Sequence, residues 1–325
     1  MRPIGGIHHV TAIAGDAQEN LDFYTGVLGL RLVKRSVNQD VTDTYHLFYA
    51  DADGHPGSAL TFFPWPDLPP GRPGSGLANE VSLAVQPDTL AWWAERLGRG
   101  RVTVAQPEVR FGERTLRFSD PHGLPLALVE TADPREFTAW RGSPVPAADQ
   151  IRGIHGVRLH ERQLASTGAF LEDGMGFTLL GDEGGWHRFA AAGGGSGRIV
   201  DVRETPGEPR GEWGVGAVHH VAWRVADEAA QQRARGDVIT AGARPTGTID
   251  RFWFRSVYFK EPGGALFELA TDGPGFAVDE SAEALGEHLV LPPWLENERA
   301  AIERALPPLR FGISSLAEPT GASHR

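Results

Sequence analysis

Short apolar runs alternate with turns rich in Pro and Gly along most of the chain. The first run, Ile7–Ile13, alternates in the way that predicts a β-strand. A helix is predicted after it, because Asp16 and Glu19 form a capping-box pair at its start and Gly29 supplies the stop. Three more strands are predicted at residues 31–37, 44–50 and 58–64. This order defines one β-α-β-β-β module.

The module recurs three times, and a repeated unit determines the architecture more firmly than any single motif. The repeats begin near residues 77, 154 and 217 and end near residues 130, 204 and 270. The fourth repeat is the clearest, since the tight turn EPGG joins its last two strands. Four such modules predict an α+β fold in which paired modules form two curved, partly open barrels.

Prolines, glycines and charged residues mark the joints between modules. They indicate an N-terminal domain of two modules at residues 1–140 and a C-terminal domain of two modules at residues 150–272. Residues 273–325 lie outside the repeat as a C-terminal extension. A short helix is predicted there at 293–306, and a frayed tail from Ser314 onward.

Composition indicates a compartment and excludes several kinds of partner. The 325 residues are 41% hydrophobic and 22% charged, as in soluble globular proteins. No run approaches the roughly 18 apolar residues of a membrane helix, and the N-terminus lacks the apolar core of a signal peptide. A net charge of −11 without a basic stripe disfavours nucleic acid. We therefore expect a cytoplasmic protein with no membrane or nucleic-acid partner, and the acidic surface and strand edges are compatible with a homo-oligomer.

The chain contains no cysteine, which excludes disulfides, thiolate metal sites and cysteine nucleophiles. Any metal must therefore be held by His, Asp or Glu. Glu268 is the first candidate ligand, because its neighbours from Ala265 to Ala270 are all apolar. A carboxylate buried in a strand is costly unless it is paired or binds a metal.

Alignment of the four modules identifies partners for Glu268. On the first strands, the second position of the histidine pair is occupied in turn by His9, Glu80, Gly156 and His220. On the last strands, aligned at their turns, the carboxylate position is occupied by Phe62, Ala127, Asp201 and Glu268. Modules one and four together thus supply two histidines and one carboxylate.

Two histidines and a carboxylate on a concave sheet are the facial triad of non-haem Fe(II) oxygenases, and Mn(II) or another divalent metal fits the same ligands. The predicted ligands are His9, His220 and Glu268. Strand alternation would direct one member of each pair into the barrel and the other, His8 or His219, outward or toward the neighbouring sheet. A lone strand histidine is usually a hydrogen-bonded core residue, but two recurring pairs favour the metal.

The other histidines are predicted to be structural, since they lie in turns, at strand edges or in the tail. They are His46, His55, His122, His155, His160, His187, His288 and His324. Glu80 and Asp201 leave open a decayed second site in modules two and three. Gly156 and Ala127 beside them disfavour a second metal.

At these residues the sequence resembles the vicinal-oxygen-chelate superfamily, which includes glyoxalase I, extradiol ring-cleaving dioxygenases, fosfomycin-resistance enzymes and bleomycin-binding proteins. More narrowly, it looks like the hydroquinone-type ring-cleaving dioxygenases. The resemblance extends from about residue 5 to about residue 310. Its segments are GIHHVTAIAGDAQENLDFYTGVLGLRLVKRSVNQD, YHLFYAD, GHPGSALTFFPWP, AVHHVAWRV and RSVYFKEPGGALFELATDGPGFAVDE.

The resemblance implies that modules one and four share the metal site on His9, His220 and Glu268. It implies catalytic or pocket roles for Tyr258, Arg251, His8, His219 and Thr11. Candidates for an apolar pocket wall are Trp223, Trp253, Phe252 and Phe254.

The function expected from these residues is an Fe(II)-dependent dioxygenase that opens a dihydroxylated aromatic ring with O2. A hydroquinone-type substrate is favoured over a catechol. Tyr258, Arg251 or a neighbouring histidine would stabilise developing negative charge or move a proton. One alternative is a glyoxalase-type metal-dependent lyase or isomerase, which would use a second carboxylate where Phe62 stands. The other is a non-catalytic small-molecule binding protein on the same fold.

Overall fold

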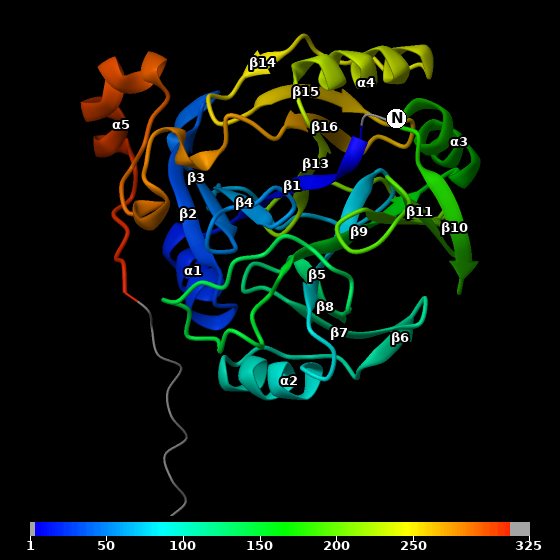
Figure 1. Cartoon of the computed structure of the whole chain (residues 1–325), viewed down its shortest axis with the longest axis horizontal. Helices are drawn as coiled ribbons and strands as arrows, with labels where there is room; N and C mark the ends of the chain where they lie inside the picture. The colour runs from blue at the N-terminus through cyan, green and yellow to red at the C-terminus, as the bar shows by residue number, and fades with distance from the viewer. Residues whose placement is uncertain (1–3, 313–325) are drawn as a thin grey trace, which may run out of the picture.

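The computed structural model describes residues 4–312 and contains the four predicted modules (Figure 1). Module one comprises β1 (Ile4–Ala14), α1 (Ala17–Leu21) with the π-helical turn Asp22–Val27, β2 (Arg31–Asn38), β3 (Val41–Ala50) and β4 (Ala59–Pro64). Module two comprises β5 (Leu77–Val85), α2 (Leu90–Arg99), β6 (Glu108–Arg110), β7 (Glu113–Ser119) and β8 (Pro125–Glu130). Module three comprises β9 (Gly153–Glu161), α3 (Leu164–Ala169) with the π-helical turn Phe170–Gly174, β10 (Thr178–Glu183), β11 (Trp186–Ala190) and β12 (Ile199–Glu204). Module four comprises β13 (Val218–Val225), α4 (Glu228–Thr240), β14 (Ile249–Asp250), β15 (Arg255–Lys260) and β16 (Leu266–Thr271).

Two eight-stranded sheets result, each joining two modules through their first strands. The first has the order β14-β15-β16-β13-β1-β4-β3-β2 and the second the order β10-β11-β12-β9-β5-β8-β7-β6. The central pairs, β1 with β13 and β5 with β9, are antiparallel. The first sheet therefore unites modules one and four, as the resemblance implies. The division into domains at residues 1–140 and 150–272 stays a prediction.

The helices are short and lie at the periphery of the two sheets, as α2 and α4 show in Figure 1. Helix α1 begins as predicted, since the Asp16 side chain accepts hydrogen bonds from the backbone N–H groups of Gln18 and Glu19. Within residues 4–312, no helix combines the length and the apolar character needed to cross a bilayer.

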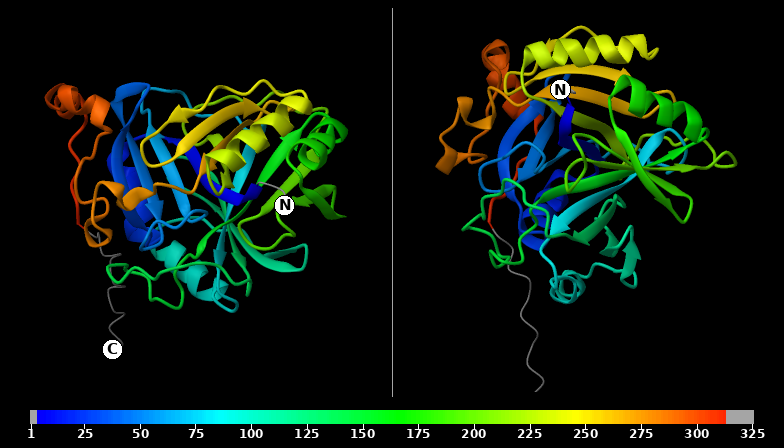
Figure 2. Two further views of the ribbon diagram at one scale, coloured as in Figure 1. Left: turned by 45° about the horizontal axis from the view of Figure 1, so that its top comes forward. Right: turned by 45° about the vertical axis from the view of Figure 1, so that its right-hand side comes forward.

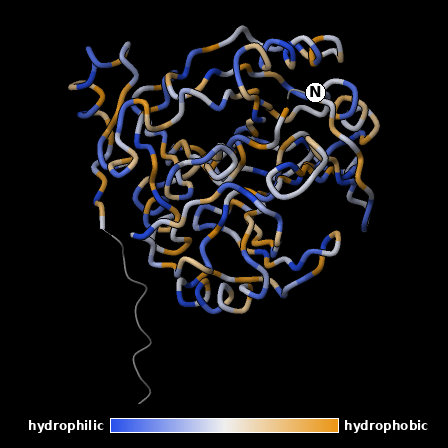
Figure 3. Tube along the Cα trace, viewed as in Figure 1, coloured by the Kyte–Doolittle hydropathy of each residue, from blue (hydrophilic) through white to orange (hydrophobic). Residues whose placement is uncertain are grey.

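Both faces of the first sheet are buried. Leu32, Leu47 and Phe62 belong to the main core, which includes the residues packed under the helices. Their strand neighbours Val33 and Phe48 point to the other face, where they form a smaller apolar cluster. Figure 3 shows apolar stretches concentrated along the strands in the middle of the molecule. The smaller cluster covers part of the concave face, and the polar residues of the candidate site lie on this same face.

The C-terminal extension packs against module one, beside β2 and β3 (Figure 2). It contains the 3-10 turns Phe276–Val278, Ala282–Ala284 and Pro293–Glu298, followed by α5 (Arg299–Ala305). The helix predicted at 293–306 is confirmed, although its first half is a 3-10 turn. The frayed tail predicted from Ser314 lies outside the described residues.

A buried pair of acidic residues lies where the two sheets meet. Glu161, at the end of β9, is fully buried, and its carboxyl group lies against Gly263 in the turn before β16. Glu261 in that turn accepts hydrogen bonds from Thr167 and from the backbone of Gly263 and Ala265. Burial, together with the nearby charge of Glu261, raises the pKa of Glu161 to about 9. Glu161 therefore stays protonated at neutral pH.

Candidate metal centre

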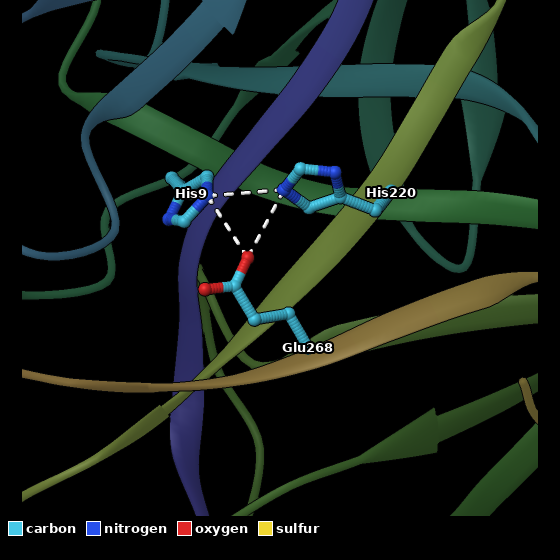
Figure 4. Close-up of side chains that lie close together, drawn as sticks. All are labelled: His9, His220 and Glu268. Carbon is cyan, nitrogen blue, oxygen red and sulfur yellow. Dashed lines mark hydrogen bonds and ion pairs between the residues drawn. The ribbon is translucent and has the colours of Figure 1, made fainter. Parts of the chain in front are cut away.

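Three predicted residues converge on the concave face of the first sheet (Figure 4). Glu268 Oε2 on β16 lies 3.4 Å from His9 Nε2 on β1 and 3.0 Å from His220 Nε2 on β13. The two Nε2 atoms are 3.3 Å apart. All three residues are buried, so the sheet brings their polar atoms together away from bulk water.

Each histidine pair sits on a β-bulge. His8 is an extra residue of β1 opposite β13, and His219 is an extra residue of β13 opposite β1. Strand alternation alone predicts that His8 and His219 point out of the barrel or toward the neighbouring sheet, and the bulges interrupt that alternation. Because each bulge interrupts strand alternation, Nδ1 of His8 lies 2.9 Å from Nδ1 of His9, and Nδ1 of His219 lies 2.8 Å from Nδ1 of His220.

These contacts orient the inner rings. Burial, followed by the charge of the neighbouring ring, lowers the pKa of His8 and of His219 to about 3, so both are neutral at pH 7. A neutral outer ring can accept the Nδ1 proton of the inner ring. That tautomer leaves Nε2 of His9 and of His220 with a free lone pair directed toward Glu268.

Glu268 is held in its ionised form. Its burial alone would raise its pKa, but the nearby imidazoles of His9 and His220 lower the pKa well below its usual value. Ser256 on the neighbouring strand β15 donates a hydrogen bond of 2.5 Å to Oε1. Oε2 has no well-aligned hydrogen-bond donor among the described residues. A buried carboxylate oxygen in this state fits a cation between it and the two imidazoles.

The position equivalent to Glu268 in module one holds Thr61 rather than Phe62. In module four, Ala222 lies two residues after His220 and pairs with Glu268 on the last strand. In module one, Thr11 lies two residues after His9 and pairs with Thr61 on the last strand. Alignment at the turns was therefore wrong by one residue, and such a slip places a side chain on the opposite face. Phe62 is in the main core. Thr61 Oγ1 instead lies 2.8 Å from Thr11 Oγ1, which is 3.0 Å from Nε2 of His220.

His46, predicted to be structural, lies beside the candidate centre. It lies within β3, where its ring contacts those of Phe48 and Phe63. Its Nε2 is 2.9 Å from Thr61 Oγ1. Burial lowers its pKa well below the usual value, so the ring is neutral. The alternation of TYHLFYA could have revealed it, because His46 and Phe48 share a face.

A cavity of about 40 Å³ opens beside the inner histidines. Its polar lining includes His46, Tyr258, Arg251 and the hairpin residues Asn38, Gln39 and Asp40. The Arg251 guanidinium lies 5.6 Å from the centre of the Tyr258 ring and 2.9 Å from Asp40 Oδ2. Burial raises the pKa of Tyr258, and the nearby charge of Glu268 adds to this. The phenol is therefore a neutral donor, and Arg251 is a cation facing the cavity.

The apolar wall comes largely from the loop before β15. Trp253 and Phe254 line the cavity, as predicted, whereas Trp223 belongs to the main core. Phe252 has a φ of 73°, and its backbone N–H donates to Asp250 Oδ1. Such left-handed backbone is costly for a large side chain and is often found at functional sites.

The equivalent place in the second sheet is occupied by ion pairs. Arg110 donates two hydrogen bonds to Glu80, and Arg188 donates two to Asp201. Arg158 lies 3.3 Å from Asp201 as well. Among the described residues, the only cluster of His, Asp and Glu suited to a metal is the one in the first sheet. Arginines therefore neutralise Glu80 and Asp201, the two acidic residues that were candidates for a second metal site.

The chain matches the model of the Glyoxalase/Bleomycin resistance protein/Dioxygenase superfamily over residues 6–128 and 153–269. It belongs to this superfamily. The two matched ranges include all three converging residues. Ring-cleaving dioxygenases of the Glyoxalase/Bleomycin resistance protein/Dioxygenase superfamily depend on a metal, and the buried cluster offers one set of ligands for it.

Individual relatives cover nearly the whole chain. "Putative ring-cleaving dioxygenase MhqO" of Bacillus subtilis is 43% identical over 93% of this chain and 96% of its own. Chlorohydroquinone/hydroquinone 1,2-dioxygenase of Sphingobium indicum is 33% identical over 93% of this chain and 96% of its own. A crystal structure of a Bacillus subtilis protein is 41% identical, covers 95% of this chain and 99% of its own, and superposes with a TM-score of 0.89. The superfamily fold therefore extends over the full length of the repeat.

Proposed function

We propose that the protein is an Fe(II)-dependent ring-cleaving dioxygenase that opens a dihydroxylated aromatic ring of the hydroquinone type. The observation that carries this proposal is the buried set of His9, His220 and Glu268 beside a cavity with aromatic walls. One relative with high coverage is named as a putative ring-cleaving dioxygenase, and another is named as a chlorohydroquinone/hydroquinone 1,2-dioxygenase.

Nε2 of His9, Nε2 of His220 and Oε2 of Glu268 would hold the metal. When bound, Fe(II) would supply a Lewis acid and a redox-active centre at which the aromatic diol and O2 meet. The outer histidines of both bulges fix the ring orientation of these ligands, and Ser256 fixes the carboxylate.

Tyr258 and Arg251 would act on the substrate itself. A hydroxyl group of the ring becomes negatively charged when it loses its proton, and the Arg251 cation stabilises that charge across the cavity. The neutral Tyr258 hydroxyl can donate a hydrogen bond to the same oxygen. The rings of Trp253 and Phe254 exclude water from this place, which strengthens both interactions.

The proton released by the substrate has a route away from the site. Thr61 Oγ1 lies 2.8 Å from Thr11 Oγ1 and 2.9 Å from His46 Nε2. The three atoms form a continuous polar chain. The two hydroxyl groups can each accept one proton and donate another, and the neutral His46 ring can receive it. We assign His46 the role of passing this proton on, because the burial that keeps its ring neutral disfavours holding a proton there.

The direct test is oxygen uptake by the protein loaded anaerobically with Fe(II). We expect uptake with methylhydroquinone, less uptake with catechol, and none in Glu268→Gln, which keeps the shape of the side chain but loses its charge. His160→Gln is the matched control, since His160 lies in the second sheet and pairs with Glu208.

Three results would contradict the proposal. Metal-dependent conversion of a hemithioacetal without O2 would indicate the glyoxalase-type lyase, although Thr61 stands where its second carboxylate would be needed. Metal-dependent binding of the diol without turnover would indicate a binding protein. Oxygen uptake by Glu268→Gln equal to that of the wild type would show that the Glu268 carboxylate is not needed for the reaction.

A further inference from the structure

The segment of the C-terminal extension at residues 274–291, here called the C-terminal strap, lies along the open edge of β2 (Figure 1). The Val290 N–H donates to the Arg35 carbonyl, and the Arg31 guanidinium donates to three strap carbonyls. Gly286 approaches so closely that a Cβ there would lie 1.9 Å from the Leu32 carbonyl oxygen. The strap thus covers a sheet edge with specific contacts.

A fully buried lysine fixes the strap to the sheet. Lys34 Nζ on β2 lies 2.7 Å from Asp279 Oδ1 and 2.5 Å from Glu280 Oε2. A buried ammonium is tolerated only when it is paired, so the lysine holds both strap residues in place. The second oxygen of Asp279 accepts a 2.9 Å hydrogen bond from Nε1 of Trp253. Asp279 therefore connects β2 to a wall residue of the cavity.

A second strap residue supports the same wall from behind. The Phe276 ring lies 5.2 Å from the Phe48 ring and 6.4 Å from the Phe254 ring, measured between centroids. Both of these rings line the cavity, and the Phe254 ring is 5.2 Å from that of His9. Phe276 itself is buried and does not line the cavity. Gly54 leaves room for it, since a Cβ there would lie 2.9 Å from the Phe276 ring.

We propose that Phe276 and Asp279 determine which ring substituents the cavity accepts, because they fix the positions of Phe48, Phe254 and Trp253. They are positioning residues that act through the wall and do not touch the substrate. This inference rests on the proposed function for the identity of the substrate class. The contacts that support it are independent of any metal.

Phe276 acts by limiting how far the side chains of the cavity wall can move outward. With Phe276 in place, Phe48 and Phe254 have a filled space behind them, so a bulky substituent meets a rigid surface. Phe276→Ala removes that filling and lets both rings move away from the site. Because each methyl group in an apolar pocket changes discrimination about tenfold or more, the preference between small and bulky substituents should change measurably.

The experiment compares methylhydroquinone with tert-butylhydroquinone. We expect the ratio of kcat/KM for the bulky to the small diol to rise about tenfold in Phe276→Ala. Asp279→Ala should raise the ratio in the same direction, and Asp279→Asn should restore only part of the original preference, because its single amide oxygen can accept from Trp253 or from Lys34 but not from both. Ile302→Ala is the control, since Ile302 is equally buried in the extension but packs in the main core.

Anaerobic binding of the two diols, followed by tryptophan fluorescence, gives a readout that does not require turnover. If the wild-type protein binds both diols without oxidising them, the proposed function fails, and the ratio of the two dissociation constants still tests the strap. A ratio in Phe276→Ala within about twofold of wild type, in a folded variant, would overturn the inference. An equal rise in Ile302→Ala would also overturn it, because general loosening would then explain the change.

Discussion

Ser256→Ala tests how the protein prepares Glu268 for a metal. The substitution removes the hydroxyl group that donates a 2.5 Å hydrogen bond to Glu268 Oε1, at a place where both residues are fully buried. A hydrogen bond to a charged group contributes about 1.5 to 3 kcal/mol. Loss of a group that orients a metal ligand typically lowers metal affinity about 10- to 100-fold, which is about 1.4 to 2.7 kcal/mol. The two magnitudes agree, so we expect the dissociation constant to rise by that factor.

The assay is anaerobic calorimetric titration with Fe(II), repeated with Mn(II), on the metal-free protein at pH 7. Ser36→Ala is the matched control, because Ser36 is also a fully buried strand serine of the first sheet but has no hydrogen-bond partner among the described residues. We expect Ser36→Ala to bind both metals as the wild type does.

The reasoning is refuted if Ser256→Ala binds both metals with wild-type affinity while remaining folded. Glu268 would then be oriented by its strand alone. A similar loss in Ser36→Ala would also refute it, because the effect would come from a general change in the buried sheet.

Three further outcomes are expected. Thr61→Val keeps the side-chain shape but interrupts the polar chain to His46, so kcat should fall about 100-fold with unchanged metal affinity, as measured by steady-state kinetics and calorimetry. Asp201→Asn removes one carboxylate from the buried arginines, while Arg188 keeps its contact with Glu113, and should lower the free energy of unfolding by about 1.5 to 3 kcal/mol in urea, without changing metal affinity. The pKa of Glu161 is raised to about 9 in the fold, so its stabilisation is present at low pH and is lost as pH rises from about 4.5 toward 9. Urea unfolding at pH 6 and pH 8 should show a decrease of about 1 to 3 kcal/mol in wild type and a smaller one in Glu161→Gln.

The repeat made the architecture and three converging residues predictable. Periodicity identified the strands of module one and module four, and equivalent positions in the two modules identified His9, His220 and Glu268. These predictions depend only on strand period and repeat register, which the sequence carries directly. The identity of the metal and the roles of these residues stay predictions.

Bulges and turn lengths limited what the sequence could reveal. The bulges at His8 and His219 were not predicted, because a one-residue bulge has no composition signal. Thr61 was missed because the turn before β4 has a different length from the turn before β16, so alignment at the turns shifted by one residue. Ser256 shares a face with Tyr258, and alternation alone could have identified it.

The contact of β1 with β13 determines when the centre can form during synthesis. His9 and His220 belong to strands at opposite ends of the repeat, and Glu268 follows still later. A ribosome adds about 5 to 20 residues per second, so roughly 10 to 50 s pass between the synthesis of His9 and that of Glu268. Throughout that time the nascent chain has no complete site to capture a metal, and β2 has no strap along its edge. Under the proposed function, metal loading is therefore a late event, and the edge of β2 stays uncovered until the strap emerges.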